Sequence, residues 1–359
     1  MTSPLTKYAL IPCVNCGSPP EDHETFINTV VSHHGHMYGD KLEIVLCSKC
    51  GLVFLNPQPT RDALDLFYRE EYYQKTPEVA DIEALKTSKK WQRDFLFTWL
   101  ENQIPDDILD WDILDIGSGY GVWLQWFDQS NRMSGIDSSK QASKVARDIF
   151  GINAYQSDFL ANDLMDEQYD LITGLAIIEH FNDPLEALIE LNRLLKNNGY
   201  LYLQTPDIHS MVLRQGFSRY FKVVHTYYYS LQTLTSLLVK AGFEVIVSRR
   251  RPHLIETSGF LFPNNYWSGE IDILAVKKQR SSLDDARRQP PASNDRDGAY
   301  TSLKSAIERD RFYIWYANLY RMAIIRIPFK LIFKLAALIK LPRSIFKVQA
   351  DRLGLDFDS

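Results

Sequence analysis

The sequence has no long apolar run and little glycine or proline. No stretch of about eighteen uninterrupted apolar residues occurs, so no ordinary membrane span is encoded. With 17 Gly and 16 Pro in 359 residues, the chain is not fibrous, and 45% hydrophobic residues exclude wholesale disorder. The first residues lack the charged-then-apolar pattern of a secretory signal, so we expect a cytoplasmic protein. The length allows a full core plus one or two smaller modules.

Acidic residues are missing from one part of the chain. Residues 311–350 contain eight Lys or Arg and no Asp or Glu, whereas the whole chain has a formal charge of −5. The remainder therefore carries about −13, which argues against a general nucleic-acid binder. Arg326, Lys330 and Lys334 are spaced by four, which places them on one helical face. We predict a basic amphipathic helical tail over 300–359. It contacts an anionic membrane surface at the inner face of the membrane, or packs on the acidic body or a second subunit.

The four cysteines form two Cys-x-x-Cys-Gly pairs. They are Cys13, Cys16, Cys47 and Cys50. In each pair a tight turn can bring two thiolates to one side, and the following glycine tolerates the bend. Two such pairs make a tetrahedral sulfur site that suits structural Zn²⁺. Two disulfides are the alternative, which the missing export signal disfavours. We assign residues 1–75 to this module.

Apolar strands alternate with helical patterns after residue 111. This alternation is typical of a doubly wound α/β sheet with helices on both faces. The domain is predicted over 76–278. The polar stretch 279–299, with Pro290 and Pro291, has few apolar side chains to bury, so we predict that it is a linker. The predicted strands are 113–116, 133–137, 169–173, 200–204, 243–247 and 271–276, and the predicted helices lie near 122–129, 140–150, 184–196 and 231–241.

A glycine turn follows the first of these strands. Gly117, Gly119 and Gly121 form Gly-x-Gly-x-Gly, whereas a dinucleotide site would have its third glycine at position 122. Asp115, just before the turn, disfavours a phosphate and suits a cationic ligand. Asp137 ends the second strand, where a carboxylate can accept both ribose hydroxyls. We assign to a nucleoside cofactor Asp115, Gly117, Ser118, Gly119, Gly121, Asp137, Ser138, Asp158, Phe159 and Leu175.

Residues 111–277 resemble class I S-adenosylmethionine-dependent methyltransferases. The likeness is carried by the glycine turn and by Glu179-His180-x-x-Asp183-Pro184, typical of a branch that includes quinone-biosynthesis and many natural-product enzymes. Residues 13–73 resemble the zinc ribbon fused to many bacterial methyltransferases of this type. The resemblance implies a Rossmann-like seven-stranded sheet and S-adenosylmethionine as cofactor.

Two histidines are candidates for catalysis. His180 follows the fourth strand and His225 precedes a helix that often walls the acceptor site in the family. His180 either takes a proton from the acceptor or shapes the cofactor pocket. Asp207 with His209 is a further acceptor-facing pair, and Arg249, Arg250 and Arg251 either read an acidic group or form a solvated loop.

The expected function is S-adenosylmethionine-dependent methyl transfer. The acceptor is expected to be a small molecule or a glycan- or lipid-linked metabolite, and not a nucleic acid. One alternative is a non-catalytic S-adenosylmethionine-binding scaffold. A nicotinamide-dependent oxidoreductase is another, which Val122 and Asp115 oppose.

Overall fold

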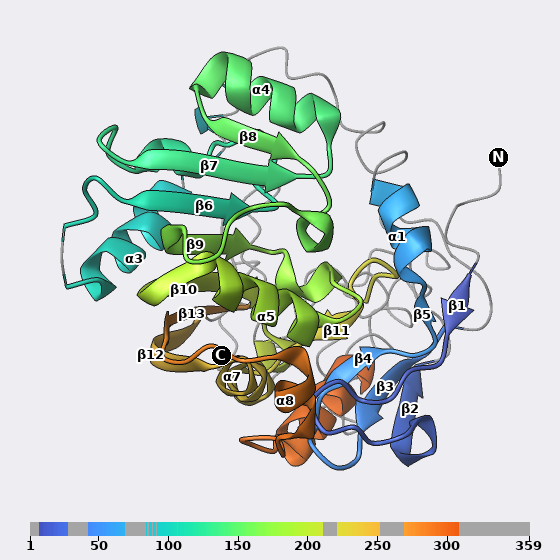
Figure 1. The fold of residues 1–359 in the computed structure, drawn as a ribbon. Helices are drawn as coiled ribbons and strands as arrows, with labels where there is room; N and C mark the ends of the chain where they lie inside the picture. Colours follow the sequence, from blue (N-terminus) through green and yellow to red (C-terminus); the bar gives the residue numbers. More distant parts are fainter. Residues whose placement is uncertain are drawn as a thin grey trace, which may run out of the picture.

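A seven-stranded sheet forms the centre of the protein. The computed structural model describes residues 7–27, 42–68, 84, 86–87, 89–90, 92–105, 107–210, 221–251 and 269–308. The strand order is β12-β13-β10-β9-β6-β7-β8 (Figure 1), which confirms the predicted fold class. The strands are β6 (Asp112–Ile116), β7 (Arg132–Asp137), β8 (Asn153–Gln156), β9 (Tyr169–Leu175), β10 (Leu195–Pro206), β12 (Phe243–Arg251) and β13 (Glu270–Lys277).

Strand β6 lies where the strand order reverses. It pairs in parallel with β7 on one side and with β9 on the other, and β8 and β10 continue the two halves in parallel. The two antiparallel pairings of this sheet both involve β13, which runs antiparallel to β10 and to β12. In open α/β sheets, ligands bind at the carboxyl ends of the strands at such a reversal. The topology therefore places the glycine turn after β6 at the expected binding position.

Helices cover both faces of this sheet. Helices α5 (Pro184–Leu194) and α7 (Leu231–Lys240) contribute to one core, and α3 (Thr98–Gln103) packs with residues 123–127 in another. Side-chain caps set the helix starts: Ser139 for α4 (Lys140–Phe150), Asp183 for α5 and Ser230 for α7. The alternating apolar pattern of the sequence thus corresponds to two buried layers.

The N-terminal module shares a sheet with the larger domain. It contains β1 (Tyr8–Ala9), β2 (His23–Ile27), β3 (Ile44–Cys47), β4 (Val53–Leu55), β5 (Gln58–Pro59) and α1 (Arg61–Phe67). Strand β11 (Tyr227–Tyr228) pairs with β4 and completes a four-stranded sheet in the order β11-β4-β3-β2. Val223, Val224 and Tyr228 are buried in one core with Leu64 and Phe67. The module is therefore joined to the domain by backbone pairing and by a common core.

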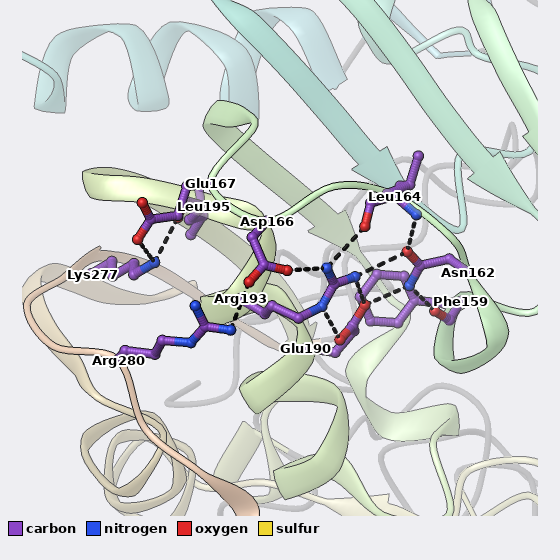
Figure 2. A network of polar contacts seen from close by, with 10 residues as sticks. All are labelled: Phe159, Asn162, Leu164, Asp166, Glu167, Glu190, Arg193, Leu195, Lys277 and Arg280. Carbon is purple, nitrogen blue, oxygen red and sulfur yellow. Dashed lines mark hydrogen bonds and ion pairs between the residues drawn. The ribbon is translucent and has the colours of Figure 1, made fainter.

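The stretch expected to be a linker is folded onto the body. It contains α8 (Leu283–Arg288), whose Ala286 is buried in the main core. Arg280 pairs with Asp166 at 2.6 Å, and Asp166 also binds Arg193 of α5 (Figure 2). Residues 296–308 are helical, and Ala299, Leu303 and Ala306 are buried against the N-terminal module. Small and apolar residues at helical spacing give this segment more to bury than its polar composition suggests.

The tail is predicted over 300–359; its first residues, 300–308, belong to the helix just described, and residues 309–359, with the whole acid-free stretch 311–350, lie outside the described residues. Within the described ranges, no helix is both long and apolar enough to cross a membrane. Contact of the tail with a membrane stays a prediction.

Candidate active site

One cavity opens at the carboxyl ends of β6, β7 and β9. Its volume is about 920 Å³, large enough for a nucleoside cofactor together with part of an acceptor. Nine of the ten predicted cofactor residues line it, and His180 lines it too. The N-terminal module forms part of its wall through Arg61, Leu64 and Tyr68, as Figure 1 shows for α1 beside the strand ends.

The glycines of the turn have different structural roles. Gly117, Gly119 and Gly121 all have positive φ, at 65°, 52° and 79°. A Cβ added at Gly119 would meet no atom within 4 Å, so this glycine keeps cavity space open. A Cβ at Gly121 would lie 2.4 Å from Ile152 Cδ1, and Gly121 does not line the cavity. Gly121 therefore serves close packing and does not contact the ligand space.

Asp137 is fixed by the turn that it faces. Its Oδ2 accepts a hydrogen bond from the Gly119 backbone N–H at 2.9 Å, and its Oδ1 accepts from Ser139 N–H at 2.8 Å. The side chain is 7% exposed and lines the cavity beside Ser138. A carboxylate oxygen has more than one acceptor site, so the oriented group can still accept hydroxyl protons from a ribose.

Asp115 is a buried acid beside the same cavity. The Thr173 hydroxyl donates to its Oδ1 at 2.6 Å, and Trp123 Nε1 donates to Thr173 at 3.1 Å. Burial raises the pKa of Asp115 to about 8, and the Asp137 charge adds to the rise. A cation placed next to Asp115 would favour its ionised form, so the position suits a positively charged ligand.

Asp158 has a partner that the sequence did not reveal. It caps the helical turn Phe159–Ala161 through Leu160 N–H and pairs with Arg61 at 3.1 Å. Arg61 also lies 3.6 Å from Glu186. Asp158 and Phe159 both line the cavity, but one carboxylate oxygen of Asp158 already binds a guanidinium from α1. Sequence reasoning missed Arg61 because it precedes Asp158 by 97 positions and no local pattern connects them.

His180 lies on the cavity wall, with hydrogen-bond partners at Nδ1 and a carboxyl group near Nε2. Its Nδ1 is 2.9 Å from the Val224 carbonyl and 2.5 Å from the Tyr68 hydroxyl. Its Nε2 faces Glu179 Oε1 at 4.0 Å. A carbonyl can only accept, so the Val224 contact favours a proton on Nδ1, and the Glu179 carboxyl group, when ionised, would favour a second proton on the ring. Tyr68 is a further residue that the sequence did not single out.

His225 contacts His180 but does not line the cavity. The two rings are perpendicular with centroids 4.7 Å apart. Glu179 is buried at 2% exposure, and its Oε2 accepts from the Thr205 hydroxyl at 2.9 Å. Burial raises the pKa of Glu179 to about 7. Ligand atoms of Glu179, His180 and His225 all lie within 4.8 Å of one another, so the two predicted catalytic histidines form one cluster with an acid.

The other polar candidates bind acids of the protein itself. Arg249 and Arg251 lie on β12, not in a loop, and both donate to Asp272 at 2.6 Å. Asp207 is fully buried and accepts from Arg250 at 2.7 Å.

His209 lies between two carboxylates. Its ring is 3.5 Å from Asp207 and 3.0 Å from Asp295. Burial lowers the pKa of His209, but the two carboxylates outweigh burial and raise it to about 9. These contacts, like those of the three arginines, are structural links, and none of the five side chains lines the cavity.

The four cysteines converge on one point. Cys13 Sγ lies 3.5 Å from Cys50 Sγ, and Cys16 Sγ lies 3.4 Å from Cys47 Sγ. All four sulfurs lie within 4.8 Å of one another, and none is in a disulfide. A Zn²⁺ tetrahedron with Zn–S bonds of about 2.3 Å has sulfur–sulfur edges of about 3.8 Å, close to these separations.

Comparison with known proteins fits this arrangement. A family model described as "Methyltransferase domain" matches residues 79–248. A tRNA U34 carboxymethyltransferase from Desulfotalea psychrophila is 30% identical over 175 residues, which cover 45% of this chain and 52% of that protein. A ubiquinone biosynthesis O-methyltransferase from Pseudomonas aeruginosa (strain UCBPP-PA14) is 28% identical over 145 residues, covering 36% of this chain and 62% of the relative.

A solved structure of an S-adenosylmethionine-dependent methyltransferase from Mesorhizobium loti is also similar. It is 18% identical, covers 51% of this chain and 99% of that chain, and has a TM-score of 0.42. Of the curated relatives, by contrast, the chain spans only about half the length. The stretch that matches the methyltransferase-domain model, residues 79–248, includes the glycine turn and the Glu179-His180 segment.

Proposed function

We propose that the protein transfers the methyl group of S-adenosylmethionine to a small-molecule acceptor, either free or linked to a glycan or lipid. The observation that carries the proposal is the convergence of the glycine turn, Asp137 and His180 on one cavity. Six acidic side chains line this cavity, compared with the cations Arg61 and Lys89. That balance disfavours a polyanionic acceptor such as RNA.

The residues around the turn fit this cofactor. Asp137 would accept the ribose hydroxyls, the open space at Gly119 admits the nucleoside, and Asp115 faces its cationic part. When bound, S-adenosylmethionine supplies a methyl group on a sulfonium, whose displacement leaves a neutral thioether. The protein's main task is then to hold donor and acceptor in line.

His180 is the group that takes the acceptor's proton. A hydroxyl or acidic carbon must lose a proton during transfer, and His180 is positioned on the cavity wall to receive it. The Val224 carbonyl and the Glu179 carboxylate would then stabilise the imidazolium. Tyr68 orients the ring through Nδ1, so the N-terminal module contributes to the reactive site.

Calorimetry and a labelled-methyl acceptor screen test the proposal. Wild-type protein should bind S-adenosylmethionine and not NADH, and it should label an acceptor in a metabolite extract. His180→Gln should still bind the cofactor but lose most of the labelling. NADH binding without S-adenosylmethionine binding would contradict the proposal, and cofactor binding without any labelled acceptor would favour the scaffold.

We also propose that the four cysteines hold one structural Zn²⁺. Lys240 of α7 supports this, because it is 1% exposed and donates to the Asn15 carbonyl, between Cys13 and Cys16, at 2.6 Å. Lys240 has no carboxylate partner among the residues whose positions are described. A buried cation needs an anion nearby, and a zinc tetrathiolate carries a net charge of −2. Native mass spectrometry should find one zinc per chain, and two disulfides without zinc would contradict the assignment.

A further inference from the structure

The two carboxylate oxygens of Glu179 have different surroundings. The side chain is 2% exposed, and its Oε2 accepts from the Thr205 hydroxyl at 2.9 Å. Its Oε1 has no hydrogen-bond partner in the described part of the chain and lies 4.0 Å from His180 Nε2. A buried acceptor without a partner is unfavourable, so a group that brings positive charge to this point would stabilise it.

Backbone contacts hold two imidazole rings beside this oxygen. The Glu179 carbonyl accepts from the Thr226 backbone N–H at 2.8 Å, which brings the preceding residue, His225, next to the Glu179-His180 turn. The two histidine rings lie perpendicular, with centroids 4.7 Å apart. One ligand atom from each of the three side chains lies within 4.8 Å of the other two. The three side chains therefore meet, although they come from two distant segments of the chain.

The surroundings of the three side chains are typical of metal ligands. A ligating histidine usually donates its second ring N–H to a carbonyl or carboxylate, and a ligating carboxylate is itself hydrogen-bonded. His180 Nδ1 lies 2.9 Å from the Val224 carbonyl, which leaves the Nε2 lone pair for a metal. The Thr205 hydroxyl fixes the Glu179 carboxylate in the same way. Because His180 lines the cavity, an ion can reach the three ligands and keep a fourth position for water.

Two imidazoles and one carboxylate select the class of ion. Imidazole nitrogen suits Zn²⁺ and similar transition metals, whereas Mg²⁺ and Ca²⁺ take oxygen ligands. Zn²⁺ bonds of about 2.0–2.2 Å place tetrahedral ligand atoms about 3.4 Å apart. The 4.0 Å gap between Glu179 and His180 then closes by about 0.6 Å, which small side-chain rotations supply. The donor set therefore fits Zn²⁺.

We propose that Glu179, His180 and His225 form a second metal site, which binds Zn²⁺, and that an ion held there inhibits methyl transfer. The ion would occupy the Nε2 lone pair of His180, with which the ring would otherwise take the acceptor's proton. The inhibition rests on the proposed function, whereas the metal site does not depend on it.

Zinc titration, followed by native mass spectrometry and calorimetry, tests the site. Wild-type protein should take up one Zn²⁺ per chain beyond its content at purification, and excess Mg²⁺ should not compete. Glu179→Gln keeps an acceptor for Thr205 but loses the anionic ligand, and His225→Gln loses one imidazole. Each should weaken the added zinc at least about 10-fold. Glu101→Gln makes the same change at an exposed position of α3 and should bind zinc as wild type does.

The outcomes separate the site from the proposed function. Wild-type protein that takes up no added zinc, or Glu179→Gln that binds it equally well, would overturn the site while the proposed function stands. Labelled-methyl transfer should fall as the added zinc binds, and an unchanged rate would overturn the inhibition. If wild-type protein binds no S-adenosylmethionine, the proposed function and the inhibition both fail, and zinc uptake alone decides the site. Thermal unfolding of each variant confirms that the binding data come from folded protein.

Discussion

Replacing Asp115 by Asn should make the cofactor-free protein more stable and make it bind its cofactor less well. Burial raises the pKa of Asp115 to about 8, far above the usual value near 3.9 for an unfolded chain. Between these two values the folded state holds a proton that the unfolded state releases. Stability attributable to this group therefore falls as the pH rises from about 4 to about 8. Asn resembles the neutral acid and can still accept from Thr173.

The magnitude follows from the separation of the two pKa values. At pH 7, about three pH units above the pKa in the unfolded chain, Asp115 lowers the free energy of unfolding by at most about 4 kcal/mol. At pH 5 it lowers the free energy of unfolding by about 1.5 kcal/mol. The stability difference between Asp115→Asn and wild type should thus grow by about 1.3 kcal/mol per pH unit over this interval. The slope is the decisive quantity, because any packing cost of the amide is constant with pH.

Urea unfolding at pH 5, 6 and 7 without cofactor measures this slope. The exposed Asp163→Asn variant is the control, since it changes the same charge without burial. A stability difference that stays constant with pH, or that favours wild type increasingly as the pH rises, would refute the reasoning. Calorimetry on Asp115→Asn should show weaker binding of S-adenosylmethionine than wild type, because this variant lacks the carboxylate that would face the cation.

Four other results are expected. Gly119→Val should abolish cofactor binding, measured by calorimetry, because the added side chain fills the cavity. The control Gly151→Val, at a glycine that also has positive φ and open space around it at the end of α4, should lose similar stability and keep cofactor binding. Cys47→Ser should lose the zinc in native mass spectrometry and lower Tm, and an unchanged metal content would contradict the four-cysteine site. His180→Gln should reduce kcat by about 10²–10⁴-fold with little change in cofactor Kd. Tyr68→Phe should reduce kcat about 10-fold, because the His180 ring loses the hydroxyl that orients it. Equal kcat of Tyr68→Phe and wild type would exclude that role.

Local signals predicted the cofactor half of the site. The Gly-x-Gly-x-Gly turn, Asp115 before it and Asp137 after the next strand are each within about twenty residues of one another, and strand–turn–helix order fixes their relative positions. The structure confirms that fold and brings these residues to one cavity. For Gly121 the motif predicts a ligand contact, but its neighbour in the structure is Ile152, a contact that only the packed fold specifies.

Long-range contacts were beyond sequence reasoning. Tyr68 reaches His180 across 112 positions, and Arg61 reaches Asp158 across 97, so no periodicity reports either pair. For the three consecutive arginines, the sequence left binding of an acidic group and a solvated loop open, because their acidic partners, Asp272 on β13 and Asp207 after β10, lie in other parts of the chain. For the same reason, residues 279–299 gave no sign that they pack on the body.

The pairing of β11 with β4 has a consequence for exchanging parts between related enzymes. Gln58 and Thr226, whose contact flanks this pairing, are 168 positions apart, so the N-terminal module is completed by a strand encoded far downstream. A chimaera that takes residues 1–75 from a relative would pair a foreign β4 with the resident β11 and would replace Arg61 and Tyr68 in the cavity wall. Acceptor preference and folding efficiency should therefore be inherited together, and a successful graft must carry β11 along with the module.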